Sequence, residues 1–399
     1  MERALILIGG SIMGSGLLYV QAAQCLGLQP ITLSDNPSRY DNFGAKDVEA
    51  IRIDTDDLGA LIRECSRLRE TYDIAGITGA EDSFYATASK LCRHFDLPGP
   101  NPEAIEQCCD KYTQRQLLAA SGVPIPAYRL AANAADVEHF AAEIGLPVIV
   151  KPAVGSGSVG VRLCSTTREV AEHTNYLLGG QHTWPTGPRI LVEEFAQGPS
   201  YWTDTIGNEV IGIGMSHSGN DIYPAPLTED KHERITDISL SCLRALGLGW
   251  GPAGIEIRWT KRGPVVIEVN PRLHGSPVPQ LVRLAYGVDL ITAHIKLAIG
   301  EEWDLRKRHS QTAAARCLVA HRGGTLDWIG GDSEAAAVPG VVEVKFYGQT
   351  QRPIFGKGDY RDYLGHVIAA SSSLPRTEAI LQRAVDLINW SITPLGGVS

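Results

Sequence analysis

The chain has 399 residues, of which 44% are hydrophobic and 20% charged, proportions typical of a soluble globular protein with two or three domains. The formal net charge is −9 without a basic stripe, which argues against a nucleic-acid partner. No apolar run approaches the roughly 18 residues that span a bilayer, so no membrane association is expected. The eight cysteines are scattered without a C-x-x-C pair, a usage typical of reduced thiols in a cytoplasmic protein.

Residues 4–100 alternate apolar strand-like runs with stretches of helical periodicity, the pattern of a parallel, doubly wound sheet. The apolar run that enters Gly9 predicts a buried strand rather than a signal peptide. The expected strands are 4–8, 30–33, 50–53 and 74–78, and the expected helices are 17–25, 57–72 and 83–95. A Pro- and Gly-rich cluster at 97–102 ends this half.

The second half mixes helices with short strands. The expected helices are 102–121, 136–144, 167–178 and one closing the chain near 376–390. The expected strands are 148–151, 161–164 and 189–194, with antiparallel strands within 201–214 and 254–270. No internal repeat or low-complexity tract is present.

Two glycine-rich loops follow predicted strands. The first, at 9–16, precedes Asp35 at about the separation found in dinucleotide folds, but its GGxxxGxG spacing also suits a structural turn or the edge of a substrate pocket. The second, at 153–160, follows Lys151 and could fold its N–H groups over phosphates. A lysine that ends an apolar strand is costly unless it meets an anion, although a solvated lysine beside a loop is the simpler alternative.

A predicted hairpin at 254–270 carries paired acids. A three-residue turn that pairs Thr260 with Pro264 places Glu256 opposite Glu268, with Asn270 on the same face. Opposed carboxylates repel unless a cation or proton intervenes, and such oxygen ligands suit Mg²⁺. The alternative is that both acids face solvent on an edge hairpin.

Arg272 and His274 follow this hairpin directly. An arginine beside a metal site can hold a transferring phosphoryl group or a developing oxyanion. His274 could contact a substrate, and a histidine packed within the structure is the alternative.

The ordered motifs resemble the ATP-grasp superfamily, specifically its carboxylate–amine ligase branch. They are Asp110-Lys111, Val150-Lys151-Pro152 with its glycine loop, Val192-Glu193-Glu194, and Gly254-Ile255-Glu256 followed by Ile267-Glu268-Val269-Asn270-Pro271-Arg272. The resemblance covers nearly the whole chain. It implies an α/β fold with a Rossmann-like domain at 1–110, an ATP-grasp core at 111–300 and a C-terminal α+β subdomain at 301–399. The lid would span about 127–205, and the metal-site strands 254–270.

The resemblance also implies roles for single residues. Those expected to bind ATP are Lys111, Lys151, Ser156, Gly157, Ser158, Glu193, Glu194 and the backbone of Ala196. Those expected to bind two Mg²⁺ ions, or Mn²⁺, are Glu256, Glu268 and Asn270, with Glu268 bridging. Arg272 would be catalytic, and the substrate side would be lined by Glu81, His274 and Gly275. Ser200 stands where many relatives carry a ribose-binding glutamate.

The implied activity is the phosphorylation of a substrate carboxylate to an acyl phosphate, which an amine then attacks, releasing ADP and phosphate. Within the branch, the chain resembles L-amino-acid ligases that form dipeptides or amide-bearing products. Three alternatives stay open: an enzyme acting on phosphorylated purine-type precursors, a non-catalytic ATP-binding protein, and a nicotinamide-dependent oxidoreductase. The expected partners are therefore small molecules, and a homodimer is one alternative for the assembly.

Overall fold

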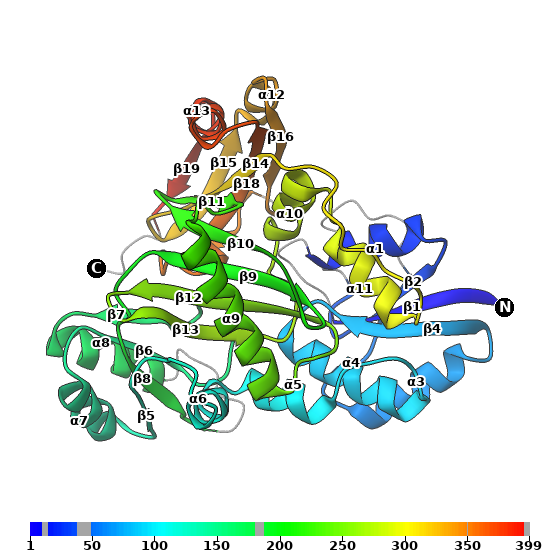
Figure 1. Cartoon of the computed structure of the whole chain (residues 1–399), viewed down its shortest axis with the longest axis horizontal. Helices are drawn as coiled ribbons and strands as arrows, with labels where there is room; N and C mark the ends of the chain where they lie inside the picture. Colours follow the sequence, from blue (N-terminus) through cyan, green and yellow to red (C-terminus); the bar gives the residue numbers. More distant parts are fainter. Residues whose placement is uncertain (10–14, 38–48, 180–186, 349, 395–399) are drawn as a thin grey trace.

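The structure is a computed structural model that describes residues 1–9, 15–37, 49–179, 187–348 and 350–394 (Figure 1). Four sheets and the helices around them make up the described part of the chain. None of the described helices has the length and apolar character needed to cross a membrane. Of the first predicted glycine loop, residues 10–14 lie outside the described residues.

The N-terminal unit is a parallel sheet flanked by helices, as the alternating pattern predicted. Its strands, in the order β3-β2-β1-β4, are β1 (Glu2–Ile8), β2 (Gln29–Ser34), β3 (Glu49–Arg52) and β4 (Tyr72–Gly79). Its helices are α1 (Ser15–Cys25), α3 (Leu58–Leu68) and α4 (Asp82–Phe95). The apolar run of β1 is fully buried from Ala4 to Ile6 because helices cover the sheet.

A small four-stranded antiparallel sheet forms the lower left part of Figure 1. Its order is β5-β8-β6-β7, with β5 (Tyr128–Ala131), β6 (Val148–Pro152), β7 (Arg162–Cys164) and β8 (Ile190–Glu194). Two helices, α7 (Ala134–Ile144) and α8 (Thr167–Leu178), pack on it. The helices α5 (Pro102–Cys109) and α6 (Lys111–Ala120) precede this sheet in the chain.

An eight-stranded antiparallel sheet runs through the middle of the molecule (Figure 1). In the order β13-β12-β9-β10-β11-β14-β18-β16 it contains β9 (Ser200–Ile206), β10 (Glu209–His217), β11 (Asn220–Tyr223), β12 (Pro252–Thr260), β13 (Gly263–Asn270), β14 (Thr312–Val319), β16 (Val341–Phe346) and β18 (Tyr363–Ser371). A three-stranded sheet contains β15 (Gly324–Gly330), β17 (Pro353–Ile354) and β19 (Asn389–Thr393). The remaining helices are α9 (Glu229–Leu246), α10 (Val278–Tyr286), α11 (Leu290–Ala298), α12 (Asp332–Ala336), α13 (Leu374–Val385) and the short 3₁₀ helix Tyr360–Asp362.

Three predicted helices are corrected by the structure. The helix expected over 57–72 ends at Leu68, and Tyr72 begins β4. The helix expected over 102–121 is two helices, because Asp110 is extended and caps α6 with its side chain. The closing helix ends at Val385 rather than near 390, and Trp390 belongs to β19. Local periodicity cannot separate these cases from a longer helix, because an Asp cap and a short edge strand each occupy only a few residues.

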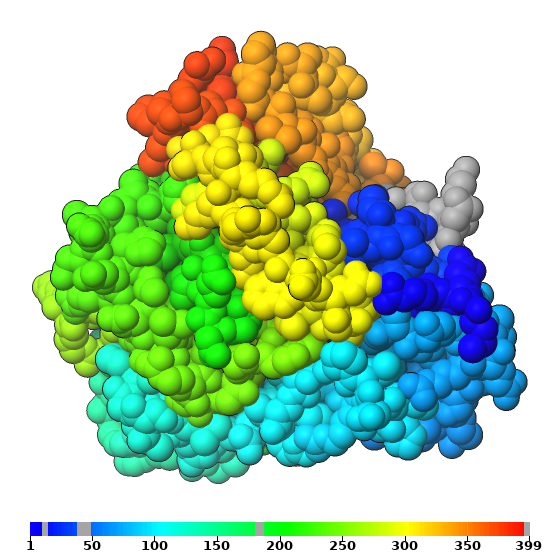
Figure 2. All heavy atoms as spheres, turned by 45° about the vertical axis from the view of Figure 1, so that its right-hand side comes forward, coloured from blue at the N-terminus to red at the C-terminus, as the bar shows by residue number. Residues whose placement is uncertain are grey.

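α11 joins the C-terminal half to the N-terminal sheet. In Figure 2 the yellow segment that includes α11 lies against the blue N-terminal unit. At this contact His294 is fully buried, and its Nδ1 lies 2.6 Å from the hydroxyl of Tyr19. Its Nε2 lies 3.4 Å from both the Thr78 and the Tyr85 hydroxyls. Burial lowers the pKa of His294 from its ordinary value of 6.5 to about 3.

We expect this buried imidazole to make stability depend on pH. Between pH 6.5 and pH 3 the unfolded chain binds a proton that folded His294 does not, so the free energy of unfolding falls as pH falls through this window. The contribution of one such group is up to about 1.4 kcal/mol per pH unit. Urea unfolding of His294→Gln at several pH values should show a shallower decline than the wild type. The exposed His139, changed to Gln, should leave the slope unaltered.

Candidate active site

The β12–β13 hairpin carries the predicted metal ligands. Glu256 of β12 lies opposite Glu268 of β13, as predicted. The predicted turn is wrong, because Thr260 pairs with Gly263 across a two-residue turn. A β-bulge at Ile267 adds one residue to β13, and this extra residue restores the pairing of the two glutamates.

The two carboxylates and Asn270 share one face of this hairpin. The amide Nδ2 of Asn270 donates to Oε1 of Glu256 at 3.5 Å. Glu256 is exposed on β12, but desolvation of its carboxylate by the surrounding protein, followed by the charge of Glu268, raises its pKa. Burial also opposes ionisation of Glu268, but Lys111 and Lys151 outweigh it and lower the pKa of that residue. The pKa values of the two opposed acids are thus shifted in opposite directions. A bound cation would stabilise the ionised form of both carboxylates, so the pair suits a cation site.

Lys111 connects the carboxylates to the second glycine loop. Its Nζ lies 3.1 Å from Oε1 of Glu268 and donates to the carbonyl of Gly155 at 2.5 Å. Burial lowers the pKa of Lys111, but Glu268 more than compensates and the pKa is raised. Lys111 is the first residue of α6, whose cap Asp110 accepts from the Thr113 N–H at 2.8 Å. The helix cap therefore fixes the position of this lysine.

α6 also covers the free edge of β13. The side-chain amide of Gln114 binds the backbone of Val269 as a neighbouring strand would. Its Nε2 donates to the Val269 carbonyl at 2.7 Å, and its Oε1 accepts from the Val269 N–H at 2.9 Å. Arg115 donates to the carbonyl of Ile267 at the bulge. These contacts hold the strand on either side of Glu268. The sequence analysis missed both residues, since a polar residue in a helical stretch gives no sign that it faces a strand.

A buried ion cluster lies behind the site. The carboxylate of Glu193 lies 2.7 Å from Nε of Arg115 and 2.6 Å from Nζ of Lys151, with side chains only 3%, 0% and 4% exposed. Burial lowers the pKa of Lys151, while the charge of Glu193 opposes this effect. Burial opposes ionisation of Glu193, yet the two cations lower its pKa. Both oxygens of Glu193 are therefore occupied by cations, and its contact with adenine stays a prediction.

We expect Glu193→Gln to destabilise the protein strongly. The substitution leaves Arg115 and Lys151 buried beside a neutral amide, and breaking a buried ion pair typically costs about 3–5 kcal/mol. Urea unfolding should show this loss. The adjacent Glu194 pairs with Arg262 at the surface, at 2.8 Å, so Glu194→Gln should cost less than about 1 kcal/mol. Similar losses from both variants would contradict the role of the buried cluster.

The other residues predicted to bind the nucleotide lie in the loop after β6 and at the end of β8. Residues 156–158 are exposed in the loop between β6 and β7, where N–H groups can reach a phosphate. Ala196 is buried just after β8. Glu194 is half-buried and engaged with Arg262, and it also accepts from the Ala127 N–H at 3.2 Å. Their contacts with ATP stay predictions.

Arg272 is held by an acid that the sequence analysis did not single out. Its Nε lies 3.0 Å from Oδ1 of Asp82, and its Nη2 donates to Oδ2 at 3.0 Å. Burial lowers the pKa of Arg272, but Asp82, followed by Glu268 and Glu81, raises it overall, so the guanidinium stays charged. Asp82 is the first residue of α4, and Glu81 is the capping residue before it. The start of this helix therefore faces the predicted catalytic arginine.

His274 lies over the sheet beside the carboxylates. Its Nδ1 lies 2.9 Å from Oδ1 of Asp204, which is fully buried in β9. A Cβ atom at Gly254 would lie 2.4 Å from Cε1 of His274, so only glycine leaves room for the ring. Burial lowers the pKa of His274, but Asp204 raises it above its ordinary value. His274 is thus part of a buried pair, and a substrate contact through it or Gly275 stays a prediction.

The predicted site residues form one connected region. Contacts join Lys111 to Glu268, Lys151 to Glu193 and Asn270 to Glu256. Glu256 lies opposite Glu268, and the charge of Lys151 helps to lower the pKa of Glu268. No group of three or more His, Cys, Asp or Glu side chains able to hold a metal occurs within the described ranges. Two carboxylates and an amide nevertheless fit Mg²⁺, because nucleotide phosphates and water supply its other ligands. All eight cysteines, which lie in the described part, are free.

Known proteins share both the site-bearing region and the C-terminal part. The model of the carbamoyl-phosphate synthase L chain, ATP binding domain, matches residues 110–306, and that of L-amino acid ligase C-terminal domain 2 matches residues 316–393. A probable alpha-L-glutamate ligase of Enterobacter sp. is 30% identical over 225 residues, which is 53% of this chain and 71% of the relative. The chain belongs to the ATP-grasp family. This family includes ATP-dependent ligases.

Other relatives extend the ATP-grasp likeness over most of the chain. The uncharacterized protein y4rH of Sinorhizobium fredii is 56% identical over 99% of this chain and 84% of its own length. Human carnosine synthase 1 is 27% identical over 80% of this chain, which spans 43% of that longer protein. The solved L-amino acid ligase of Bacillus licheniformis has a TM-score of 0.82 at 20% identity, over 98% of this chain and 99% of that one. This structure confirms the predicted ATP-grasp fold.

Proposed function

We propose that this protein is an ADP-forming ligase that joins a carboxylate to an amine, with amino acids as the substrate class. The observation that carries the proposal is the opposed pair of Glu256 and Glu268, with Lys111 at 3.1 Å from the second carboxylate. Paired acids beside buried lysines suit a triphosphate and its metal ion. The match to the C-terminal domain of L-amino acid ligases supports amino acids as substrates.

The first step is transfer of the γ-phosphoryl group of ATP to the substrate carboxylate. Lys111 and Lys151 bind the phosphates, and the N–H groups of residues 156–158 close over them. Glu256, Glu268 and Asn270 would hold Mg²⁺, which when bound neutralises phosphate charge. A carboxylate oxygen attacks the γ-phosphorus in line, and ADP leaves with the electrons of the broken P–O bond.

In the second step an amine attacks the acyl phosphate. Arg272 is charged and its side chain is 16% exposed. Its guanidinium can therefore stabilise the oxyanion that develops on the carbonyl. The C–O bond to phosphate then breaks, phosphate leaves, and the amine loses a proton to give an amide. Glu81, His274 and Gly275 are placed on the substrate side in this proposal.

Phosphate release from Mg·ATP tests the proposal. We would supply amino acids singly and in pairs, and identify products by mass spectrometry. The proposal predicts release that depends on particular pairs, with a product lighter than the sum of the two acids by one water. ATP turnover without any dependence on an acid and an amine would contradict it. Glu268→Gln serves as the control that detects contaminating ATPases.

A further inference from the structure

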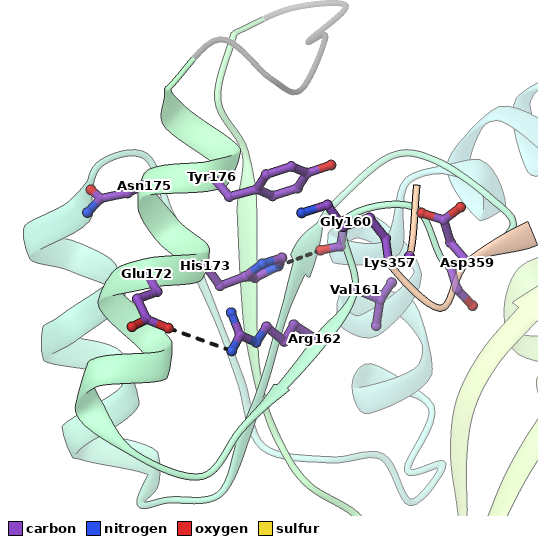
Figure 3. A pocket seen from close by; sticks show the side chains of 11 residues that line it. Gly160, Val161, Arg162, Glu172, His173, Asn175, Tyr176, Lys357 and Asp359 are labelled. Carbon is purple, nitrogen blue, oxygen red and sulfur yellow. Dashed lines mark hydrogen bonds and ion pairs between the residues drawn. The ribbon is translucent and has the colours of Figure 1, made fainter. Parts of the chain in front are cut away.

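A loop of the C-terminal part reaches over to the small four-stranded sheet and its glycine loop. Figure 3 shows the two sides of this contact around a cavity of about 630 Å³. One wall comes from β7 and α8, including Arg162, His173 and Tyr176, and the other from Lys357 and Asp359. The cavity marks where two parts of the chain that are about 200 residues apart approach each other.

The contacting loop has a fixed shape because it wraps around a buried acid. Asp362 is fully buried, and its two carboxylate oxygens accept four backbone N–H groups. The donors are residues 355–358, at distances of 2.8, 2.8, 2.5 and 2.7 Å in chain order. Charge-assisted bonds of this kind are stronger than neutral ones, so the loop is a rigid support.

Tyr360, at the end of this loop, touches the glycine loop at Gly157. The Tyr360 N–H donates to the carbonyl of Gly157 at 3.3 Å. Gly157 has φ +65°, and a Cβ atom there would lie 2.4 Å from Cδ1 of the Tyr360 ring. The tyrosine therefore occupies the space that any side chain at 157 would need. Lys357, from the same loop, lies over the ring of Tyr176 at 5.1 Å and adds a contact with α8.

The opposite side of the glycine loop is tied to the active site. Lys111 binds the carbonyl of Gly155 at 2.5 Å while it pairs with Glu268. Lys111 of the active site thus holds the glycine loop at residue 155, and Tyr360 of the C-terminal part holds it at residue 157. Between these two anchors lies Ser156, whose N–H group and that of the following residues are expected to meet the nucleotide.

We propose that Tyr360 is a positioning residue for ATP: it holds the glycine loop in the conformation that closes over the triphosphate. This inference rests on the proposed use of ATP and extends it, because it makes the C-terminal part a component of nucleotide binding. Tyr360 acts through Gly157 and does not itself touch the nucleotide. Loss of the ring removes the packing against Gly157 and loosens residues 156–158, and ATP then has to order them on binding.

The first test is the affinity of the full-length protein for Mg·ATP, measured by calorimetry. Tyr360→Ala should raise Kd about tenfold, equivalent to about 1.4 kcal/mol, while Tyr360→Phe, which keeps the ring, should bind as the wild type does. Trp328→Ala is the matched control, because it removes an aromatic ring that is 49% exposed elsewhere in the C-terminal part. Equal Kd values for wild type and Tyr360→Ala would overturn the inference.

A double-mutant cycle separates positioning from general destabilisation. In the wild type, Gly157→Ala forces a methyl group into the Tyr360 ring, whereas in Tyr360→Ala the space is open. The fold-increase in Kd caused by Gly157→Ala should therefore be smaller in the Tyr360→Ala background. Equal fold-increases in both backgrounds would overturn the inference, since a structural role alone gives independent effects. A wild-type protein that does not bind Mg·ATP at all would instead overturn the proposed function itself.

Discussion

Glu268→Gln should reduce turnover by orders of magnitude while the fold stays intact. The substitution keeps the shape of the side chain but removes the charge at the position expected to bridge the metal ions. It also removes the charge partner of Lys111, which lies 3.1 Å away. Loss of repulsion toward Glu256 offsets only part of the loss of that pair, so we expect a folded protein with a small drop in melting temperature. Steady-state phosphate release and a thermal melt measure the two quantities.

Glu334→Gln is the matched control for this prediction. Glu334 is exposed on α12, so its loss of charge should alter neither turnover nor melting temperature. Near-normal turnover by Glu268→Gln would mean that the carboxylate pair is structural. A large drop in melting temperature would mean that the Lys111 pair, rather than metal binding, explains the loss of activity.

Arg272→Lys should lower kcat by about 10²–10³, the usual effect of losing one oxyanion donor. The lysine keeps the positive charge but loses the planar fork that now faces both oxygens of Asp82 at 3.0 Å. Affinity for Mg·ATP should change little, because the proposal places Arg272 at the substrate carbonyl rather than at the triphosphate. Kinetics and calorimetry on one preparation separate the two effects.

Arg376→Lys controls for the change of side chain, since Arg376 is exposed on α13. It should behave as the wild type in both assays. A large loss of ATP affinity in Arg272→Lys, with kcat preserved, would move Arg272 from the carbonyl to the phosphates. Wild-type values of both kcat and ATP affinity in Arg272→Lys would mean that Arg272 serves only as a structural partner of Asp82.

The pairing of Glu256 with Glu268 could be predicted, but its cause could not. Alternation of side chains along the hairpin is a local property, so it places both acids and Asn270 on one face. The turn is one residue shorter than expected, and the bulge at Ile267 compensates. Arg115, which binds the Ile267 carbonyl, lies 152 residues away in the chain, so no local pattern reveals the contact.

The residues that start and end helices, unlike contacts between distant segments, can be recognised from the local sequence. The N-cap role of Asp110 could be predicted from the sequence, because aspartate is a preferred residue at the start of a helix and its side chain accepts from the Thr113 N–H. The helix α9 was not assigned from the sequence, although Thr228 before it and Gly247 after it are typical boundary residues. Neither error changes which residues meet at the site.

The acids that hold the site were beyond sequence reasoning. Asp82 and Asp204 acquire their roles only when the folded chain places Arg272 and His274 beside them, 190 and 70 residues away. A lone aspartate at a helix start or within a strand carries no signal of such a partner. Tyr360 is similar, since its contact with Gly157 depends on how the C-terminal loop docks.

The most direct test of the proposed ligase activity follows an oxygen atom from the substrate carboxylate. The protein is incubated with Mg·ATP and an amino-acid mixture labelled with ¹⁸O in the carboxyl groups, and the released phosphate is analysed by mass spectrometry. An acyl phosphate keeps a carboxylate oxygen on phosphorus when the amine displaces it, so each phosphate should carry one ¹⁸O atom. Unlabelled phosphate released together with ADP would contradict activation of a carboxylate and, with it, the proposed function.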